Sequence, residues 1–397
     1  MGKRGNGEGS VRQRRDGTWE ARLTNDGRRI SKYFNTRKEA AAWLAEAVNR
    51  QNNGSFVPPE KITVGEWMNK WFTTYSVPGI EDTTAENYEM NIRVHIVPCL
   101  GNIPLQKLTM SDVQEFFNAK ATSGRMDGKE GGLSPRTLQL VHTILHKSLN
   151  QAVKEGLIYR NPAQGTTLPK NVKKKPVYWN TDEVDSFLDV AEGDRLFPAF
   201  YMELGTGLRR GELLGIMWID IDFQVKTATI HRQLVKLGNG YTFHEYPKTE
   251  AGERVVTLPD DVIETLLFHK RRQDNEKAFC GAAYQGHDLV FCWEDGRPIN
   301  PKSFAKHFHS LVEKAGVRHI SFHAAGRHTH ATELLAAGAT LSQIQDRLGH
   351  SRYQTTADFY AAVAKELQRD AADKAQVILT RRKKKAVPDV SQKTKAN

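Results

Sequence analysis

The chain has 397 residues, with 57 lysines and arginines against 46 aspartates and glutamates, which gives a formal charge of +11. At roughly 150 residues per domain this length predicts two or three domains, and a hydrophobic content of 39% excludes wholesale disorder. The absence of any apolar run of about 18 residues and of a signal-like N-terminus argues against a membrane span and a secretory signal. Three scattered cysteines are too few for a disulfide framework or a zinc site, which fits a reducing cytoplasm.

The positive charge is concentrated at the two ends of the chain. Residues 1–60 hold 12 basic and 7 acidic residues, and residues 378–397 hold seven basic residues against one acidic residue. The intervening residues 61–377 hold 38 of each sign and are neutral overall. Basic ends around a neutral body are typical of arms that bind a polyanion, most often nucleic acid. A solubilising tail beside a charged small domain would give the same distribution.

The first segment, residues 1–56, is predicted to form three short strands and a helix. The strands Val11–Arg15, Trp19–Thr24 and Arg28–Phe34 are separated by Asp-Gly pairs, a strong hairpin signal because a type I′ turn needs positive φ at both central residues. A capping box of Thr36 and Glu39 starts the helix. We expect the exposed face of the sheet to enter a DNA major groove, with an ordinary solvated face as the alternative. The basic residues assigned to that face are Arg12, Arg14, Arg22, Arg28 and Lys32.

A helical domain is predicted over residues 62–166. Apolar residues recur at helical spacing from Val64 to Phe72. Two later helices are predicted to start with serine caps at Ser111 and Ser134, the second with proline at its first position. Acidic and basic residues nearly cancel in this domain, so charge does not indicate a binding face.

A basic linker, residues 167–176, contains no acidic residue. We expect Lys173, Lys174 and Lys175 to contact a phosphate backbone, although solvated lysine-rich linkers are common as well. The largest segment, residues 177–377, is predicted to be mostly helical with a β insertion between residues 227 and 258. Residues 378–397 are predicted to be a disordered basic tail.

Four short motifs of the largest segment occur in a fixed order. Thr-Gly-Leu-Arg-Arg-Gly-Glu at residues 206–212 is followed by Pro-Lys-Thr around Lys248 and by Arg-His-Thr-His-Ala-Thr from Arg327. Leu-Gly-His-Ser comes last at residues 348–351, with Tyr360 ten positions after His350. In this order and spacing, the set resembles the catalytic domain of the tyrosine recombinase, or phage integrase, family. The resemblance extends over nearly the whole chain, because all three segments follow the family's order.

The resemblance implies a multidomain, mainly α fold. A small three-stranded sheet plus helix would form an N-terminal arm-type DNA-binding domain, residues 62–166 a helical core-binding (SAM-like) domain, and residues 177–377 a mixed α/β catalytic domain. It also implies a site-specific recombinase that cuts and rejoins DNA strands to integrate or excise a mobile element. No metal ion and no cofactor are implied.

The same resemblance assigns roles to individual residues. Tyr360 would be the nucleophile that forms a 3′-phosphotyrosyl intermediate, and Lys248 the acid that protonates the leaving 5′-oxygen. Arg209 and Arg327 would clamp the non-bridging oxygens, since a guanidinium is a permanently charged fork that donates two parallel hydrogen bonds to phosphate. His350 would hydrogen-bond the scissile phosphate.

Two charged neighbours of Arg209 are given other roles. Arg210 is one position on, about 100° around a helix, so it is assigned to a surface or DNA-backbone contact. Glu212 is three positions on, on the same face, where it would orient Arg209 or form a plain ion pair with it.

The sequence departs from the family pattern at the first histidine of the motif. The family places that histidine three residues before the second arginine, where this chain has Ala324, and His323 is one residue further away. In an α-helix His323 would still share a face with Arg327, displaced by part of a turn. We favour His323 for the role, with His328 as the alternative.

The expected partners follow from the resemblance as well. They are double-stranded DNA at core-type and arm-type sites and further copies of the chain in a synaptic homo-tetramer, with an excisionase or a host DNA-bending protein as further candidates. The expected location is the cytoplasm of a bacterial host, in association with the nucleoid. Two alternatives stay open at this point: a DNA-binding protein of the same fold with lost or impaired catalysis, and a monomeric type IB topoisomerase.

Overall fold

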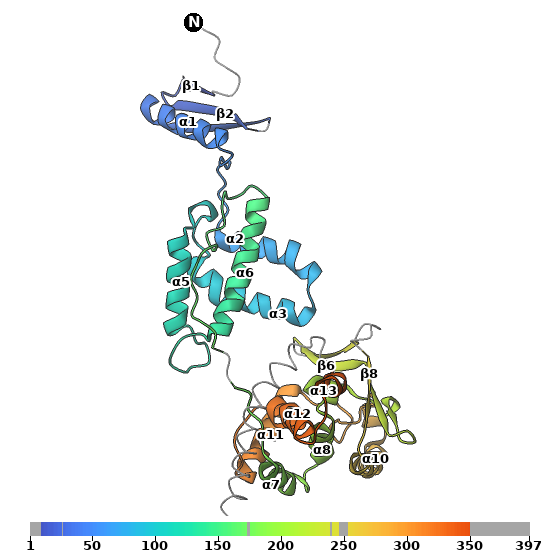
Figure 1. Cartoon of the computed structure of the whole chain (residues 1–397). Helices are drawn as coiled ribbons and strands as arrows, with labels where there is room; N and C mark the ends of the chain where they lie inside the picture. Colours follow the sequence, from blue (N-terminus) through green and yellow to red (C-terminus); the bar gives the residue numbers. More distant parts are fainter. Residues whose placement is uncertain (1–8, 26, 173–174, 239, 246–252, 350–397) are drawn as a thin grey trace, which may run out of the picture. The chain divides into compact units, whose positions relative to one another are not determined.

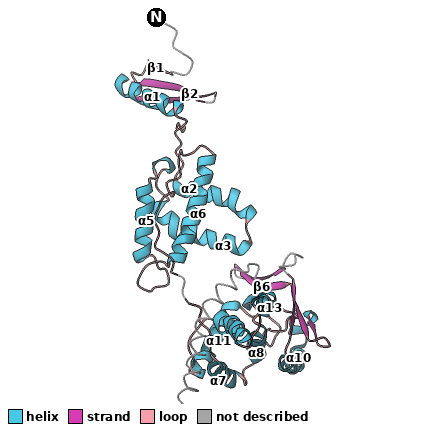
Figure 2. Cartoon of the chain, in the orientation of Figure 1, coloured by secondary structure: helices cyan, strands magenta, loops and turns pink. Residues whose placement is uncertain are grey.

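The structure is a computed structural model, and it describes residues 9–25, 27–172, 175–238, 240–245 and 253–349. Two compact units, Met1–Val172 and Lys173–Asn397, divide the chain and are taken in turn below. Helices predominate over small antiparallel sheets, as predicted (Figure 1, Figure 2). Among the described residues, no helix is both long and apolar enough to cross a membrane.

The N-terminal module is a three-stranded antiparallel sheet with a helix packed on one face, as predicted (Figure 1). The Thr36 side chain accepts a hydrogen bond from the backbone of Glu39, and the Glu39 side chain accepts one from the backbone of Thr36, which confirms the capping box. Its small core is formed by Ala21, Leu23, Ala40, Leu44 and Ala47. The elements are β1 (Ser10–Gln13), β2 (Trp19–Asn25), β3 (Arg28–Phe34) and α1 (Arg37–Asn52).

The strand register corrects the predicted basic face. Successive residues of a strand point to opposite faces, and Arg12 is paired with Glu20 while Lys32 is paired with the buried Ala21. Lys32 and Arg28 therefore lie on the helix side of the sheet, and the Lys32 ammonium is 5.8 Å from the Trp43 ring of α1. The prediction that these two share the open face with Arg12 and Arg22 is wrong, because it grouped basic residues without considering that successive side chains of a strand point to opposite faces.

The helical domain is built around α6, whose apolar side packs on α2 and α5. Ser134 caps α6 with Pro135 at its first position, as predicted. The predicted cap at Ser111 is wrong, because the Thr109 side chain accepts the hydrogen bond from the Asp112 backbone and starts the helix earlier. The elements are α2 (Val64–Trp71), η1 (Phe72–Ser76), η2 (Val77–Gly79), α3 (Asp82–Asn91), η3 (Ile92–Ile96), α4 (Val97–Leu100), η4 (Leu105–Lys107), α5 (Met110–Ser123) and α6 (Pro135–Lys154).

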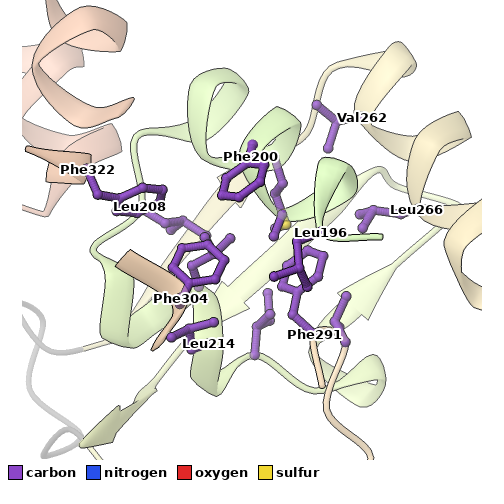
Figure 3. Close-up of a cluster of buried hydrophobic side chains, with 14 of the residues drawn as sticks. Leu196, Phe200, Leu208, Leu214, Val262, Leu266, Phe291, Phe304 and Phe322 are labelled. Atoms are coloured by element: carbon purple, nitrogen blue, oxygen red, sulfur yellow. The ribbon is translucent and has the colours of Figure 1, made fainter. Parts of the chain in front are cut away.

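The second unit is mostly helical. Its described helices are α7 (Thr181–Ala191), α8 (Phe197–Thr206), α9 (Arg210–Gly215), η5 (Trp218–Asp220), α10 (Asp260–Cys280), η6 (Gly281–Ala283), α11 (Pro301–Ala315), η7 (Ala324–His328), α12 (Thr329–Ala336) and α13 (Leu341–Leu348). Aromatic rings of α8, α11 and the segment before η7 meet in its core, where Phe200, Phe304 and Phe322 gather (Figure 3). Leu208 belongs to the same core, so its buried side chain holds the Thr-Gly-Leu-Arg motif against the rest of the unit.

The predicted β insertion is present but forms two sheets. One sheet contains β4 (Ile221–Asp222), β5 (Thr227–Ile230) and β8 (Arg254–Thr257), and the other is the hairpin of β6 (Arg232–Leu237) and β7 (Gly240–Glu245). The consecutive strands β5 and β6, separated by one residue, therefore belong to different sheets. The hairpin packs on α9.

Candidate active site

A glycine in a tight position shapes the turn that leads to Arg209. Helix α8 ends at Gly207, whose φ of 66° lies in the left-handed region that favours glycine. A Cβ atom there would lie 2.7 Å from a methyl carbon of Leu348 and 2.9 Å from the His330 ring. The turn is therefore pressed against α12 and α13. It places Arg209 at the start of α9 with its side chain 39% exposed.

Glu212 lies beneath Arg209 and binds it at two points. Its Oε2 atom accepts a hydrogen bond from the Arg209 backbone at 2.9 Å, and its Oε1 atom accepts one from Arg209 Nη1 at 2.7 Å. Arg254 of β8 donates to the same two oxygens at 3.1 and 2.8 Å. Burial would raise the pKa of Glu212, but the hydrogen bonds and charges of Arg254 and Arg209 lower it to about 2. The carboxylate is thus ionised at any working pH, and the expectation that Glu212 shares a face with Arg209 is confirmed.

Arg327 is almost fully buried, with 2% of its surface exposed. Its Nη1 atom donates to the Gly207 carbonyl at 2.8 Å, and its Nη2 atom donates to the Leu348 carbonyl at 2.7 Å. Burial, followed by the charge of Arg209, lowers the pKa of Arg327 to about 10. The guanidinium is therefore still charged at neutral pH. The structure brings the two predicted arginines to the same turn, because Arg327 binds the Gly207 carbonyl and Arg209 follows Gly207 by two residues.

Three arginines donate hydrogen bonds to three successive carbonyls at the C-terminal end of α13. The Arg347 carbonyl accepts from Arg254 Nε at 3.3 Å, the Leu348 carbonyl from Arg327, and the Gly349 carbonyl from Arg209 Nη2 at 2.9 Å. The last carbonyls of a helix have no partner within it, and they attract cations. Gly349 ends α13 with a φ of 64°, in the left-handed region that favours glycine.

The segment between His323 and Arg327 is a π-helix, not an α-helix. The element η7 covers Ala324–His328, and the backbone of Thr329 donates to the Ala324 carbonyl five residues earlier. The family spacing of three places a histidine about 60° from the arginine around an α-helix. A π-helix has roughly 4.4 residues per turn, which places a pair four residues apart at about 30° on that same side. The extra residue is thus absorbed by a wider turn, whereas α geometry would displace His323 to the other side.

The surroundings of the two candidate histidines differ. The His323 side chain is exposed, and its pKa is lowered by partial loss of water around the ring and then by the charges of His328, Arg327 and Arg209. His328 packs against the His323 ring and its Nδ1 atom lies 3.2 Å from the Val177 carbonyl. Burial lowers its pKa too, but of the two catalytic-motif arginines only Arg327 contributes. His323 therefore lies within the electrostatic reach of both arginines. Ala324, at the family position, is buried.

Glu203 is a buried carboxyl group behind this turn, which the sequence analysis missed. Neither of its carboxyl oxygens has a hydrogen-bond partner among the described residues. Its side chain fills the space above Gly326, where an added Cβ atom would lie 2.3 Å from Glu203 Cγ. Burial raises the pKa of Glu203 well above its ordinary value, against the opposing charge of Arg327. The only signal in the sequence is an acidic residue inside the apolar run of α8.

Several predicted residues lie outside the described part of the chain. They are Lys173, Lys174, Lys248, His350 and Tyr360. Of the remaining predicted DNA contacts in the second unit, Lys175 and Arg210 are exposed. The charge of Arg210 also contributes to the lowered pKa of His323, so Arg210 lies near the site.

Comparison with protein families gives two matches in chain order. Residues 63–121 match the N-terminal SAM-like domain of phage integrases, and residues 178–366 match the phage integrase family. A XerC-like tyrosine recombinase of Caldanaerobacter subterraneus subsp. tengcongensis is 29% identical, and the similarity covers 88% of this chain and 92% of that protein.

Solved structures with a similar fold are integrases as well. The Tn1549 transposon integrase in complex with transposon right-end DNA has a TM-score of 0.63 at 25% identity, and the match covers 78% of this chain and all of that one. The λ integrase dimer bound to a core site has a TM-score of 0.56 at 18% identity and covers 90% of this chain and 96% of that one. At 18% identity the likeness concerns the fold alone.

Proposed function

The chain belongs to the phage integrase family of tyrosine recombinases, and on that premise we propose that it is a site-specific recombinase whose phosphate clamp is formed by Arg209 and Arg327. One observation carries the assignment: both guanidiniums bind neighbouring carbonyls of a single turn, Gly349 and Leu348. Two fixed positive groups at one place are what a pentacovalent phosphate transition state requires. Net charge could not have indicated this site, because residues 61–377 hold equal numbers of basic and acidic residues.

The proposed reaction is a pair of transesterifications at phosphorus. The phenol oxygen of Tyr360 attacks the scissile phosphate, the bond to the 5′-oxygen breaks, and Lys248 gives that oxygen a proton. A 3′-phosphotyrosyl link replaces the phosphodiester, so rejoining by a 5′-hydroxyl needs no external energy source. His323 is assigned to accept the proton that the phenol of Tyr360 loses, and His350 to a hydrogen bond with the phosphate. Preorganised donors of this kind are commonly worth about 3–4 kcal/mol each at the transition state.

His323 is supported for the first histidine role by the π-helical turn. It lies near Arg209, Arg210 and Arg327, whose charges favour its neutral form. A neutral imidazole can accept a proton from the attacking phenol, whereas an imidazolium cannot. His328 is assigned a structural role, in which its Nδ1 atom forms a hydrogen bond with the Val177 carbonyl.

The N-terminal module is proposed as an arm-type DNA-binding domain that uses the open face of its sheet. Arg12, Arg22 and the Arg14 side chain that stacks on Tyr33 supply the positive charge there. The helical domain and the catalytic domain would hold the core-type site, with Lys175 and the adjoining lysines of the linker on the backbone. This division follows the domain limits 1–56, 62–166, 167–176, 177–377 and 378–397.

The proposed assembly is a homo-tetramer on two DNA sites, acting in the bacterial cytoplasm at the nucleoid. It is supported by the λ integrase, of which a tetramer bound to a Holliday junction has been solved. An excisionase or a host DNA-bending protein is a further proposed partner, since arm-type and core-type sites occupied together require bent DNA.

A nicked suicide substrate that carries the core site tests the proposal. The attachment site is taken from the DNA that flanks the gene. We expect a covalent protein–DNA band on a denaturing gel from the wild type and none from Tyr360→Phe. No band at a site that the protein demonstrably binds would favour the alternative, a DNA-binding protein with impaired catalysis. Strand exchange between two sites, and not relaxation alone, would then exclude a type IB topoisomerase.

A further inference from the structure

Three arginines, Arg209, Arg254 and Arg327, bind the carbonyls at the C-terminal end of α13. No motif of the sequence indicated Arg254. It begins β8, and its side chain is 12% exposed. It donates to both oxygens of Glu212 and, through Nε, to the Arg347 carbonyl. A Cβ atom on Gly349 would lie 2.8 Å from Arg254 Cδ and 3.0 Å from its guanidinium, so the arginine lies directly against that glycine.

Arg254 therefore connects two parts of the site that are distant in sequence. One is the Arg209–Glu212 pair, 42 residues before it, and the other is the turn at Gly349. From the two arginines, both in the described part of the chain, Glu212 accepts four hydrogen bonds, two from each. Because the carboxylate is shared, Arg209 has to balance only part of its charge.

Resting on the recombinase function proposed above, we propose that Arg254 is a positioning residue for DNA cleavage. By sharing Glu212 it leaves the Arg209 guanidinium available to the scissile phosphate, and by packing under Gly349 it fixes the turn that leads to His350. It does not touch the phosphate itself. Without Arg254 a larger share of the charge of Glu212 falls on Arg209, and the carboxylate then competes more strongly with the phosphate for that guanidinium.

A merely structural arginine is available for comparison in the same unit. Arg232 of β6 is also 12% exposed and binds a buried carboxylate, with Nη1 2.5 Å from Asp220 Oδ2. Its guanidinium also contacts the neighbouring His231 ring, and among the described residues it makes no polar contact with Arg209, Glu212 or α13. Arg232→Gln and Arg254→Gln thus remove the same charge from similar depth, and only the second touches the proposed site.

The test measures the single-turnover rate constant for covalent adduct formation at saturating suicide substrate, together with the Kd for the same DNA. We expect Arg254→Gln to lower the rate constant about 10- to 100-fold, the range typical of outer residues that orient a catalytic group, with a change in Kd below about threefold. Arg254→Lys, which keeps the charge but loses the fork, should fall between this variant and the wild type. Arg232→Gln should cleave within about threefold of the wild type.

A double-mutant cycle separates positioning from general destabilisation. If Arg254 acts through Glu212, then Arg254→Gln combined with Glu212→Gln should cleave no more slowly than Glu212→Gln alone, because the unshared charge is gone. Additive losses, or an effect of Arg254→Gln no larger than that of Arg232→Gln, would overturn the inference. A wild type that forms no adduct would instead overturn the proposed function, and with it the inference that depends on it.

Discussion

Two regions of the molecule use the same arrangement, a carboxylate held between two arginines, in very different surroundings. In the N-terminal sheet, Glu20 accepts one hydrogen bond from Arg12 and one from Arg22, whose side chains are 55% and 28% exposed. In the second unit, Glu212 accepts four, from arginines 39% and 12% exposed. Both carboxylates are buried, with 4% of Glu20 and none of Glu212 exposed, so the two regions differ in the number of hydrogen bonds from the arginines and in the exposure of Arg12 against Arg254. An arginine held by one bond and half exposed exchanges readily with water and salt, whereas one held by several bonds in the interior keeps a fixed geometry.

The difference matches what each region is proposed to do. An arm-type domain has to exchange a carboxylate for DNA phosphates as it binds, so loosely held arginines suit it. A cleavage site has to present its donors already oriented, because reorganisation during the reaction would be added to the barrier. The comparison therefore predicts large and specific losses from changes in the buried group, and small salt-dependent ones from the open sheet.

The largest loss is expected from Arg327→Ala. The change removes a buried charge from the phosphate clamp and leaves the Gly207 and Leu348 carbonyls without their donor. We expect the single-turnover rate constant for adduct formation to fall about 1000-fold, and about 100-fold for Arg327→Lys, which cannot bind both carbonyls as a fork. Arg318→Ala is the control, since Arg318 is 58% exposed and its ion pair with Glu183 lies outside the site. Equal rates for Arg327→Ala and the control would remove Arg327 from the clamp.

A second change probes how tightly the buried region is packed behind η7. In Gly326→Ala the new Cβ atom would lie 2.3 Å from Glu203 Cγ and 2.4 Å from its Oε1, inside a closed core. Overpacking of this kind costs about 1–3 kcal/mol in the free energy of unfolding, which urea denaturation measures. Gly193→Ala is the control, because nothing lies within 4 Å of that position and its φ is not left-handed.

The same pair gives a check on the cause. Glu203→Ala in the Gly326→Ala background removes the clashing atoms, so the double variant should be more stable than the sum of the single losses predicts. Simple additivity would show that Glu203 and Gly326 do not form one packing unit.

The contrast between the predictable and the unpredictable parts of the site follows from sequence distance. The Arg209–Glu212 pair and the Thr36 capping box lie within one helical turn, so spacing alone indicates them. The η7 turn could not be predicted, because over five residues α and π patterns differ too little. The close contact of its Gly326 with Glu203 joins residues more than a hundred positions apart, which spacing does not indicate. Arg254 could not be predicted either, because its partners Glu212 and Arg347 are 42 and 93 residues away in the sequence. The faces of Arg28 and Lys32, in contrast, follow from the two-residue period of a strand and could have been found.

A third prediction concerns pH and Glu203. Burial raises the pKa of this carboxyl in the folded state above its ordinary value of 4.5, so the folded protein holds the proton more tightly than the unfolded chain. The associated stability is complete below the unfolded pKa and is lost as pH rises through the folded pKa. Glu203→Gln carries no such proton. Its free energy of unfolding relative to wild type should therefore rise between pH 5 and pH 8, by up to about 1.4 kcal/mol per pH unit while Glu203 stays protonated.

Glu212→Gln provides the matching control for that experiment. The pKa of Glu212 is lowered to about 2, so its contribution to stability is present above the unfolded pKa and is lost only as pH falls toward 2. Its difference from wild type should thus stay constant from pH 5 to pH 8. A constant difference for Glu203→Gln as well would mean that Glu203 is already ionised in the folded protein.

The smallest effect, a change in the salt dependence of DNA binding, is expected in the N-terminal sheet, where it distinguishes the open face from the helix side. Arg22 lies on the open face beside Glu20, whereas Lys32 lies on the helix side against Trp43. Arg22→Ala should weaken arm-site binding modestly and lower the slope of log K against log salt by about 1, as expected for one lost phosphate contact. Lys32→Ala should leave that slope unchanged. Fluorescence anisotropy over a salt series measures the slope for both variants. Equal slopes would mean that DNA does not bind the open face of the sheet. The proposed phosphate contacts of Arg209 and Arg327 in the second unit would not be affected by that result.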